Sequence, residues 1–239
     1  GWVDRARLAL EAADGTPPPL DDPTGALWFF LVVSQANRQL TAGQLDAAER
    51  TVLDIHHMLQ RHPESAQQLK RLAVTYHQLG MVAQQRGHLD EAQQWYLKSL
   101  TITEELGDRP GMAISYHQLG MVAQDRGHLD EAQQWYLKSL TIKEELGNQP
   151  GMAHTFGQLG LLAEARGHPE QALDWTIRCV ALFDEFPHPA TGPGPANLAR
   201  LTAHLGIDTL ERCWRRVTGQ PLPQVVRDVI ASDPPDHAA

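Results

Sequence analysis

The chain has 239 residues, and its 20 Lys and Arg against 29 Asp and Glu give a formal net charge of −9 at pH 7. This negative charge argues against sequence-independent binding to phosphate backbones, so we expect no nucleic acid partner. With 42% hydrophobic and 21% charged residues, the composition is that of a folded globular chain and excludes intrinsic disorder for most of it.

The N-terminal region predicts a helix over residues 2–14, which the Gly-Thr-Pro-Pro-Pro run at 15–19 ends. The apolar run at 26–33 is too short to cross a bilayer, and Asp21-Asp22-Pro23 stands directly before it in place of a basic region, so we expect no membrane segment and no secretion signal. Cys179 and Cys213 are too few for a disulfide framework, which favours the cytoplasm.

A repeat of 40 residues dominates the middle of the chain. Residues 72–111 recur as 112–151 with only seven differences, one of which exchanges Thr103 for Lys143. A diverged third copy covers 152–190. A fainter copy precedes them, so four hairpins are expected within residues 26–190, at 26–63, 72–111, 112–151 and 152–190.

Each copy predicts two helices. In the second copy, Tyr116, Leu119, Gly120 and Ala123 recur at i, i+3, i+4 and i+7, which indicates the apolar stripe of a first helix, helix A. Gly127 follows this helix and can take the left-handed conformation that ends it.

Helix B is expected from Leu129 to Gly147, and Pro150 blocks its continuation. Its buried side is predicted to carry Leu129, Ala132, Tyr136, Leu140 and Ile142. The apolar faces of such a hairpin exceed what one hairpin can cover, so neighbouring hairpins are expected to stack.

These residues resemble the tetratricopeptide repeat. Its signature occurs as Tyr76, Leu79-Gly80, Gly87, Ala92 and Tyr96, and again 40 residues further on, while the third copy departs from it at Thr176. The resemblance implies an all-α fold, a right-handed α-solenoid of stacked antiparallel helical hairpins. The long repeat is similar to that of kinesin light chains, Pins-type adaptors and actinobacterial signalling proteins.

The two ends predict different elements. Residues 1–25 are expected to hold an N-terminal helix and a proline-rich connector. Helices at about 196–205, 208–217 and 223–230 are expected to cap the last hairpin within 191–232, and 233–239 to form a flexible tail.

Motifs for nucleotide, metalloprotease and serine hydrolase chemistry are missing, so we expect no enzyme and no cofactor. His88, His128 and His168 recur with the repeat as turn residues, and no ligand spacing converges, so we expect no metal site. Cys179 aligns with Ser139, which indicates a small packed residue rather than a nucleophile.

The resemblance implies that the exposed side of helix A lines a concave groove. The side chains expected there are His77, Gln78, Met81, Gln84, His117, Gln118, Met121, Gln124, Asp125, His154, Gln158 and Leu161. Relatives usually carry Asn, which grips a peptide backbone, at the position of Gln78. A glutamine amide offers the same donor and acceptor on a longer arm.

We therefore predict a non-catalytic module that binds a peptide or protein segment in the groove. The first alternative is a regulatory segment of a larger signalling ATPase, protease or effector, since the chain begins with Gly1 rather than Met and a fragment is one expectation. The second is a scaffold that self-associates by end-to-end stacking. No membrane partner is expected.

Overall fold

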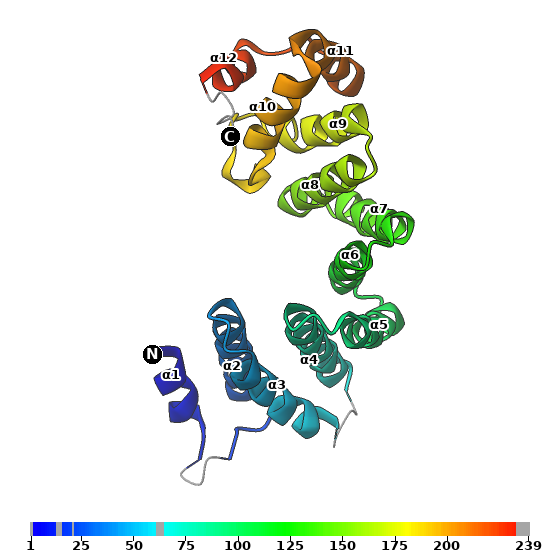
Figure 1. Ribbon diagram of the computed structural model, residues 1–239. Coiled ribbons are helices and arrows are strands. Elements are labelled where there is room, and N and C mark those ends of the chain that lie inside the picture. Colours follow the sequence, from blue (N-terminus) through cyan, green and yellow to red (C-terminus); the bar gives the residue numbers. More distant parts are fainter. Residues whose placement is uncertain (1, 13–15, 21, 61–64, 233–239) are drawn as a thin grey trace. The chain divides into compact units, whose positions relative to one another are not determined.

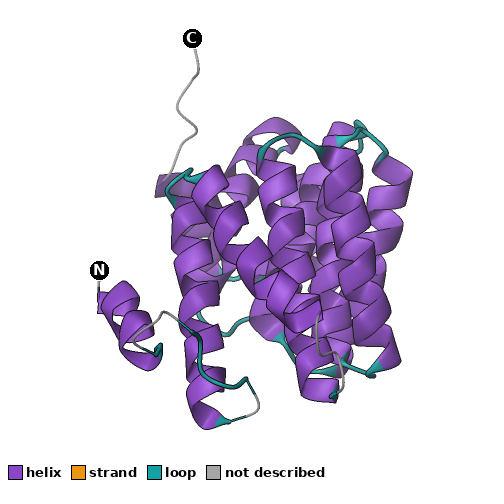
Figure 2. Cartoon of the chain, turned by 90° about the horizontal axis from the view of Figure 1, so that it is seen from below, coloured by secondary structure: helices purple, strands orange, loops and turns teal. Residues whose placement is uncertain are grey.

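The computed structural model describes residues 2–12, 16–20, 22–60 and 65–232. Within these ranges the chain consists of helices and loops without a strand (Figure 2). They hold twelve α-helices and one short 3-10 helix, η1 (Pro189–Thr191). The predicted all-α fold is confirmed. The predicted tail at 233–239 lies outside the described residues.

The helices fall into two compact units, Gly1–Val122 and Ala123–Ala239. The first unit holds α1 (Trp2–Leu10), α2 (Pro23–Thr41), α3 (Leu45–Gln60), α4 (Ala66–Gln85), α5 (Leu89–Glu105) and most of α6 (Arg109–Asp125) (Figure 1). The second unit holds α7 (Leu129–Glu145), α8 (Gln149–Ala165), α9 (Pro169–Val180), α10 (Gly194–Leu205), α11 (Ile207–Thr218) and α12 (Gln224–Ser232). Within the units, α2 with α3, α4 with α5 and α8 with α9 form helical hairpins.

Polar caps and glycines set the ends of the helices. The Asp22 carboxylate accepts a hydrogen bond from the Gly25 N–H at 2.7 Å, and Ser65 caps α4 in the same way. Gly87 and Gly127 adopt a φ of +77° in the turns between helices A and B. A side chain is strained at that angle, which explains why the turn glycine recurs.

Three helix boundaries differ from the expectation. Helix α1 ends at Leu10, whereas the sequence predicts a helix to residue 14, and residues 13 and 14 lie outside the described residues. Helix α2 begins at Pro23, because Asp22 caps it and proline suits the first helical position. Helix α9 has 12 residues, against 17 in α5 and α7, so the third copy lacks the long helix B.

Signature residues hold the α4–α5 hairpin together. Tyr96 is fully buried, and a Cβ on Gly80 would lie 2.5 Å from its Cε1 atom. The Tyr96 hydroxyl donates a hydrogen bond to Gln84 Oε1 at 3.1 Å. The ring of Trp95 stacks on Tyr76 with centroids 5.6 Å apart. The two helices can approach this closely because residue 80 has no side chain.

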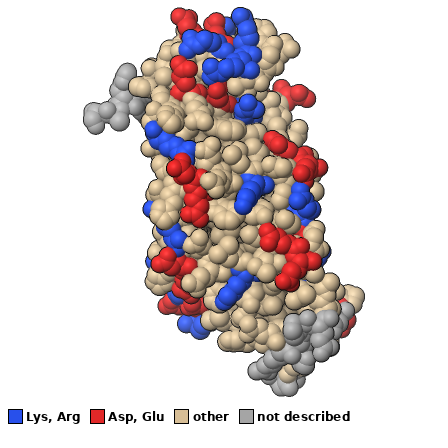
Figure 3. Space-filling model, turned by 90° about the vertical axis from the view of Figure 1, so that its right-hand side faces the viewer, with Lys and Arg blue, Asp and Glu red and all other residues tan. Residues whose placement is uncertain are grey.

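The core of the second unit joins α9 to the C-terminal helices. Leu173 and Ile177 of α9 form one buried cluster with Leu198, Leu210 and Trp214 of α10 and α11. The outer rim carries ion pairs between helices: Arg200–Glu164, Arg212–Glu170 and Arg216–Asp174. On the face shown in Figure 3, basic and acidic side chains are interspersed. Exposed pairs of this kind add little stability, so the apolar cluster is the main attachment.

Candidate functional site

The exposed side of the first helix in each repeat, in α4, α6 and α8, is the expected binding surface, and we call it the helix A face. It carries three aliphatic side chains in water, Val74, Ile114 and Leu161, which are 37%, 51% and 41% exposed. His154 is exposed on the same side of α8. In each unit the helix A face borders a cavity.

The first unit has a cavity of about 250 Å³ between α4, α5 and α6. Its lining residues are Lys70, Ala73, Val74, His77, Ser99, Thr103, Asp108, Gly111, Ile114 and Ser115. The floor is made of small residues and the walls of aliphatic ones, while Lys70 and Asp108 supply charges of opposite sign. Such a hollow suits an apolar group that carries polar atoms at its edge.

His77 is the predicted site residue that lines this cavity. Its Nδ1 atom is buried and has no hydrogen-bond partner among the described residues, and its ring lies 5.5 Å from that of Tyr96. Burial lowers the pKa of His77 to about 4, so the imidazole is neutral at physiological pH. A neutral ring can accept one hydrogen bond and donate one.

Gln78 and His117 differ from the expected open side chains, because each is only 6% exposed. Gln78 continues the buried stripe of Arg71, Thr75 and Val82, which lies about 100° around α4 from the exposed stripe. In the described structure, the Oε1 atoms of Gln78 and Gln118 are buried and accept no hydrogen bond. Two glutamines of successive repeats therefore hold an unused acceptor.

Other predicted residues are engaged in packing. Gln84 and Gln124 accept hydrogen bonds from the hydroxyls of Tyr96 and Tyr136, at 3.1 and 2.9 Å, so they support the hairpins rather than facing a groove. Burial and the nearby Asp125 raise the pKa of Tyr136. Of the remaining predicted residues, Met81 and Met121 are half-buried and Asp125 is exposed.

The second unit has a cavity of about 190 Å³ between α8, α9, η1 and the start of α10. Its lining residues are Ala153, His154, Gly157, Gln158, Leu161, Thr176, Cys179, Ala190, Thr191, Gly192, Pro193, Gly194 and Asn197. The structure thus brings together the predicted residues His154, Gln158 and Leu161. Their equivalents Val74, Gln78 and Met81 lie two repeats earlier, and Val74 lines the first cavity.

Two departures from the repeat leave this space open. Gly157 replaces the His of the earlier copies, and a Cβ there would meet no atom within 4 Å. Thr176 replaces the Tyr of the earlier copies. Both residues line the same cavity, so the two sequence differences have one structural consequence. Gly194, which follows the repeat, closes the cavity from the other side, because α10 can approach α9 only where a Cβ, 3.0 Å from Val180 Cγ1, is missing.

Cys179 forms part of the floor and is 1% exposed. Its Sγ atom lies 3.7 Å from the Thr191 carbonyl oxygen, and burial raises the pKa of the thiol to about 11. Cys213 is fully buried, and its pKa is also raised by burial. Protonated, inaccessible thiols are poor nucleophiles, so both cysteines act as packing residues.

Lys143 is a buried charged residue that no motif in the sequence marks as part of a site. It is 6% exposed, and its Nζ donates a hydrogen bond to Thr155 Oγ1 at 2.7 Å. Burial lowers the pKa of Lys143 to about 8, and both burial and Lys143 lower the pKa of His154. Its presence among the seven differences between two nearly identical copies was the signal that could have found it.

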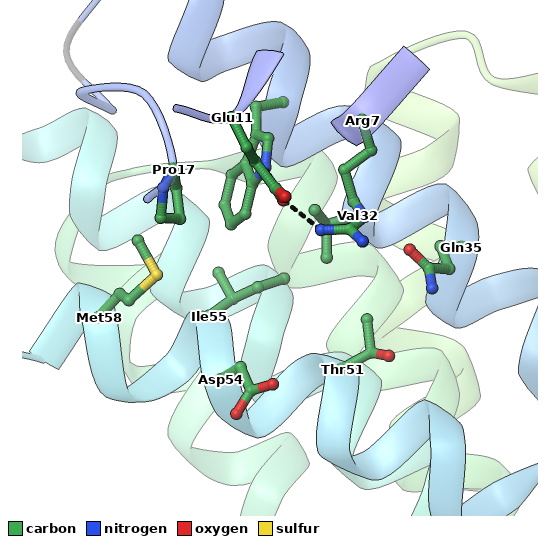
Figure 4. A pocket seen from close by; sticks show the side chains of 10 residues that line it. Arg7, Glu11, Pro17, Val32, Gln35, Thr51, Asp54, Ile55 and Met58 are labelled. Atoms are coloured by element: carbon green, nitrogen blue, oxygen red, sulfur yellow. Dashed lines mark hydrogen bonds and ion pairs between the residues drawn. The ribbon is translucent and has the colours of Figure 1, made fainter. Parts of the chain in front are cut away.

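A third cavity, of about 320 Å³, lies beside α1, α2 and α3 in the first unit (Figure 4). Arg7 and Glu11 form an ion pair at its edge, and Gln35, Asp54 and Met58 reach it from the hairpin. No motif marks this site, because its residues come from three segments that are far apart in sequence.

Over the described parts of the chain, no cluster of three or more His, Cys, Asp or Glu has the arrangement of a metal site. No helix in these parts is long and apolar enough to span a membrane.

Residues 71–145 and 112–185 match the family model described as tetratricopeptide repeat. No curated protein sequence matches the chain. BtubC (BKLC) from P. vanneervenii shares 18% identity, covers 96% of this chain and 87% of its own, and has a TM-score of 0.70.

A putative kinesin light chain from Podosopora anserina shares 18% identity over 84% of this chain and 94% of its own, with a TM-score of 0.63. For pilF of Pseudomonas aeruginosa the values are 19%, 97%, 90% and 0.53. At such identities the likeness shows the fold alone, that of helices stacked in consecutive antiparallel pairs. Residues 71–185 therefore belong to the tetratricopeptide repeat family.

Proposed function

We propose that this chain is a non-catalytic interaction module whose helix A face binds a peptide or protein segment. Repeat modules of this family generally mediate protein–protein interaction. The observation that carries the proposal is the pair of cavities on the helix A face, one in each unit, lined at repeat-equivalent positions: Ala73, Val74, His77 and Ser99 in the first, and Ala153, His154, Gly157 and Cys179 in the second.

The size of these cavities favours single side chains as occupants. They measure about 250 and 190 Å³, below the roughly 300–1,000 Å³ of typical small-molecule pockets. A cavity of about 150 Å³ is large enough for benzene. Each hollow therefore suits one aliphatic or aromatic side chain of a bound segment.

The ring of His77 supports a peptide as the occupant. His77 lines the first cavity, and burial keeps its imidazole neutral. A neutral imidazole can donate one hydrogen bond and accept another, as the carbonyl and N–H groups of a peptide backbone require. The two buried thiols are compatible with a reducing compartment, so we place this binding in the cytoplasm.

A display selection with random peptides tests the proposal, with Ile114→Glu as the disrupting variant. Ile114 is 51% exposed at the first cavity, so a charge there is tolerated by the fold but blocks an apolar side chain. Leu97→Glu is the matched control, because Leu97 is an aliphatic residue, 39% exposed, on helix B of the same unit.

We expect the selected peptides to lose at least about tenfold in affinity for Ile114→Glu and to bind Leu97→Glu normally. Gly157→His, which restores the residue of the earlier copies, should similarly weaken peptides that use the second cavity. Failure to select any peptide, or equal binding to all variants, would refute the proposal.

A further inference from the structure

The cavity beside α1 combines polar atoms of opposite kind that have no partner. The Nε atom of Arg7 and the Oε1 atom of Gln35 are both buried, and neither makes a hydrogen bond among the described residues. One is a donor and the other an acceptor. Leaving both unsatisfied is costly, which points to an occupant that accepts from Arg7 and donates to Gln35.

A carboxylate adds a charge to this set. Asp54 lines the cavity from α3, and no ion pair or hydrogen bond joins its carboxylate to another described residue. Glu11, by contrast, is engaged, since it accepts from Arg7 and from the Trp28 Nε1 atom at 2.9 Å. The free groups are therefore the Nε–H of one guanidinium, one amide oxygen and one carboxylate.

The remaining wall is apolar. Trp28 and Ile55 are 4% and 1% exposed, and Met58 completes the wall beside them. The volume of about 320 Å³ is roughly twice that of a cavity that holds benzene. It accommodates a large apolar side chain together with a polar head.

We propose that this cavity binds a free α-amino acid with a large apolar side chain. The ligand carboxylate accepts from Arg7 Nε, the ammonium donates to Gln35 Oε1 and to the Asp54 carboxylate, and the side chain packs on Trp28, Ile55 and Met58. A plain amine leaves the Arg7 donor unused, and a plain carboxylic acid leaves Gln35 and Asp54 unpaired and faces repulsion from Asp54. This site is separate from the helix A face and does not rest on the peptide-binding proposal.

Isothermal titration calorimetry of the full chain with L-phenylalanine as the probe tests this inference. The comparison compounds are 3-phenylpropionate, which lacks the ammonium, and phenethylamine, which lacks the carboxylate. We expect L-phenylalanine to bind and both comparison compounds to bind at least about tenfold more weakly. Equal binding of the three, or no heat with L-phenylalanine up to about 10 mM, would overturn the proposal.

Two variants separate ligand recognition from folding. Gln35→Met removes a buried acceptor while keeping its volume, so the thermal midpoint should stay the same or rise while affinity falls at least about tenfold. Asp54→Asn should weaken binding similarly without unfolding, because Asp54 is exposed and supports no other residue. Glu105→Gln is the control, as an exposed carboxylate on α5. L-phenylalanine affinity unchanged in both test variants would contradict the assignment.

Discussion

The α4–α5 and α8–α9 hairpins share one sequence frame but fill it differently. In α4–α5, the fully buried Tyr96 occupies the helix crossing, and a Cβ on Gly80 would lie 2.5 Å from its ring. In α8–α9, Thr176 stands in place of the tyrosine, and a Cβ on Gly160 would lie 3.4 Å from its Oγ1 atom.

The difference shows which signature residues depend on one another. Gly80 is required because Tyr96 is present, whereas Gly160 faces only Thr176 and has room for a methyl group. Thr176 and Gly157, which are smaller than their counterparts Tyr96 and His77, line the cavity of the second unit. Smaller residues in the third copy thus contribute to the candidate binding surface.

We expect the largest loss of stability when Tyr96 of the α4–α5 hairpin is replaced by threonine, the residue that α8–α9 has at this position. Tyr96→Thr should lower the free energy of unfolding by about 3–5 kcal/mol, because it removes a buried ring and leaves a void between α4 and α5. Urea denaturation of both proteins measures the change. A loss below about 1 kcal/mol would mean that the tyrosine does not hold the hairpin.

The two signature glycines should respond differently to the same substitution. Gly80→Ala should cost about 1–3 kcal/mol because the methyl group meets a ring that cannot move aside. Gly160→Ala should be neutral or add up to about 1 kcal/mol, since alanine favours the helix and has room. Chemical denaturation of the pair tests this, and equal losses would contradict the comparison.

The two nearly identical copies also differ at one buried position, where the first copy has Thr103 and the second has Lys143. Lys143→Met should raise the free energy of unfolding by about 1–3 kcal/mol at pH 7, because it removes a buried charge but keeps the aliphatic chain. The folded-state pKa of Lys143 is lowered from 10.5 to about 8. Between these values the unfolded chain binds more protons, so wild-type stability should rise with pH relative to the variant.

Denaturation curves of wild type and Lys143→Met at several pH values measure this difference. Their stabilities should converge as the pH rises from about 8 toward 10.5. Parallel pH profiles would show that Lys143 titrates normally.

We expect a smaller change in the free energy of unfolding on acidification. The titrating residue is His77, which is half-buried in α4 and whose place in the third copy is taken by Gly157. The pKa of His77 is lowered from 6.5 to about 4, so the unfolded state binds more protons within this range. Wild type should therefore lose stability relative to His77→Gln as the pH falls from 6.5 to 4. The same loss in both proteins would exclude a contribution from His77.

The sequence was sufficient to predict the fold because the pattern within each repeat indicates the helices and the turns between them. Apolar spacing at i, i+3, i+4 and i+7, with turn glycines such as Gly127, indicates helical hairpins without reference to tertiary contacts. Cys179 was expected to pack because it aligns with Ser139, and it lies buried.

The site was less predictable, because adjacent residues of a helix differ by about 100° in direction. Periodicity alone could not show which residues of α4 lie on the buried side and which on the exposed side. Gln78 is buried, whereas its neighbour His77 lines a cavity. The cavity at Arg7 and Gln35 required three distant segments to meet. Such a meeting is a tertiary event that leaves no local pattern.

Photo-cross-linking is the most direct test of the central claim that the helix A face receives a peptide. A benzophenone amino acid is placed at residue 114 of the helix A face or at residue 97 of helix B, and each protein is irradiated with a selected peptide. We expect a covalent adduct from residue 114 and none from residue 97. An adduct from residue 97 with none from residue 114 would contradict it.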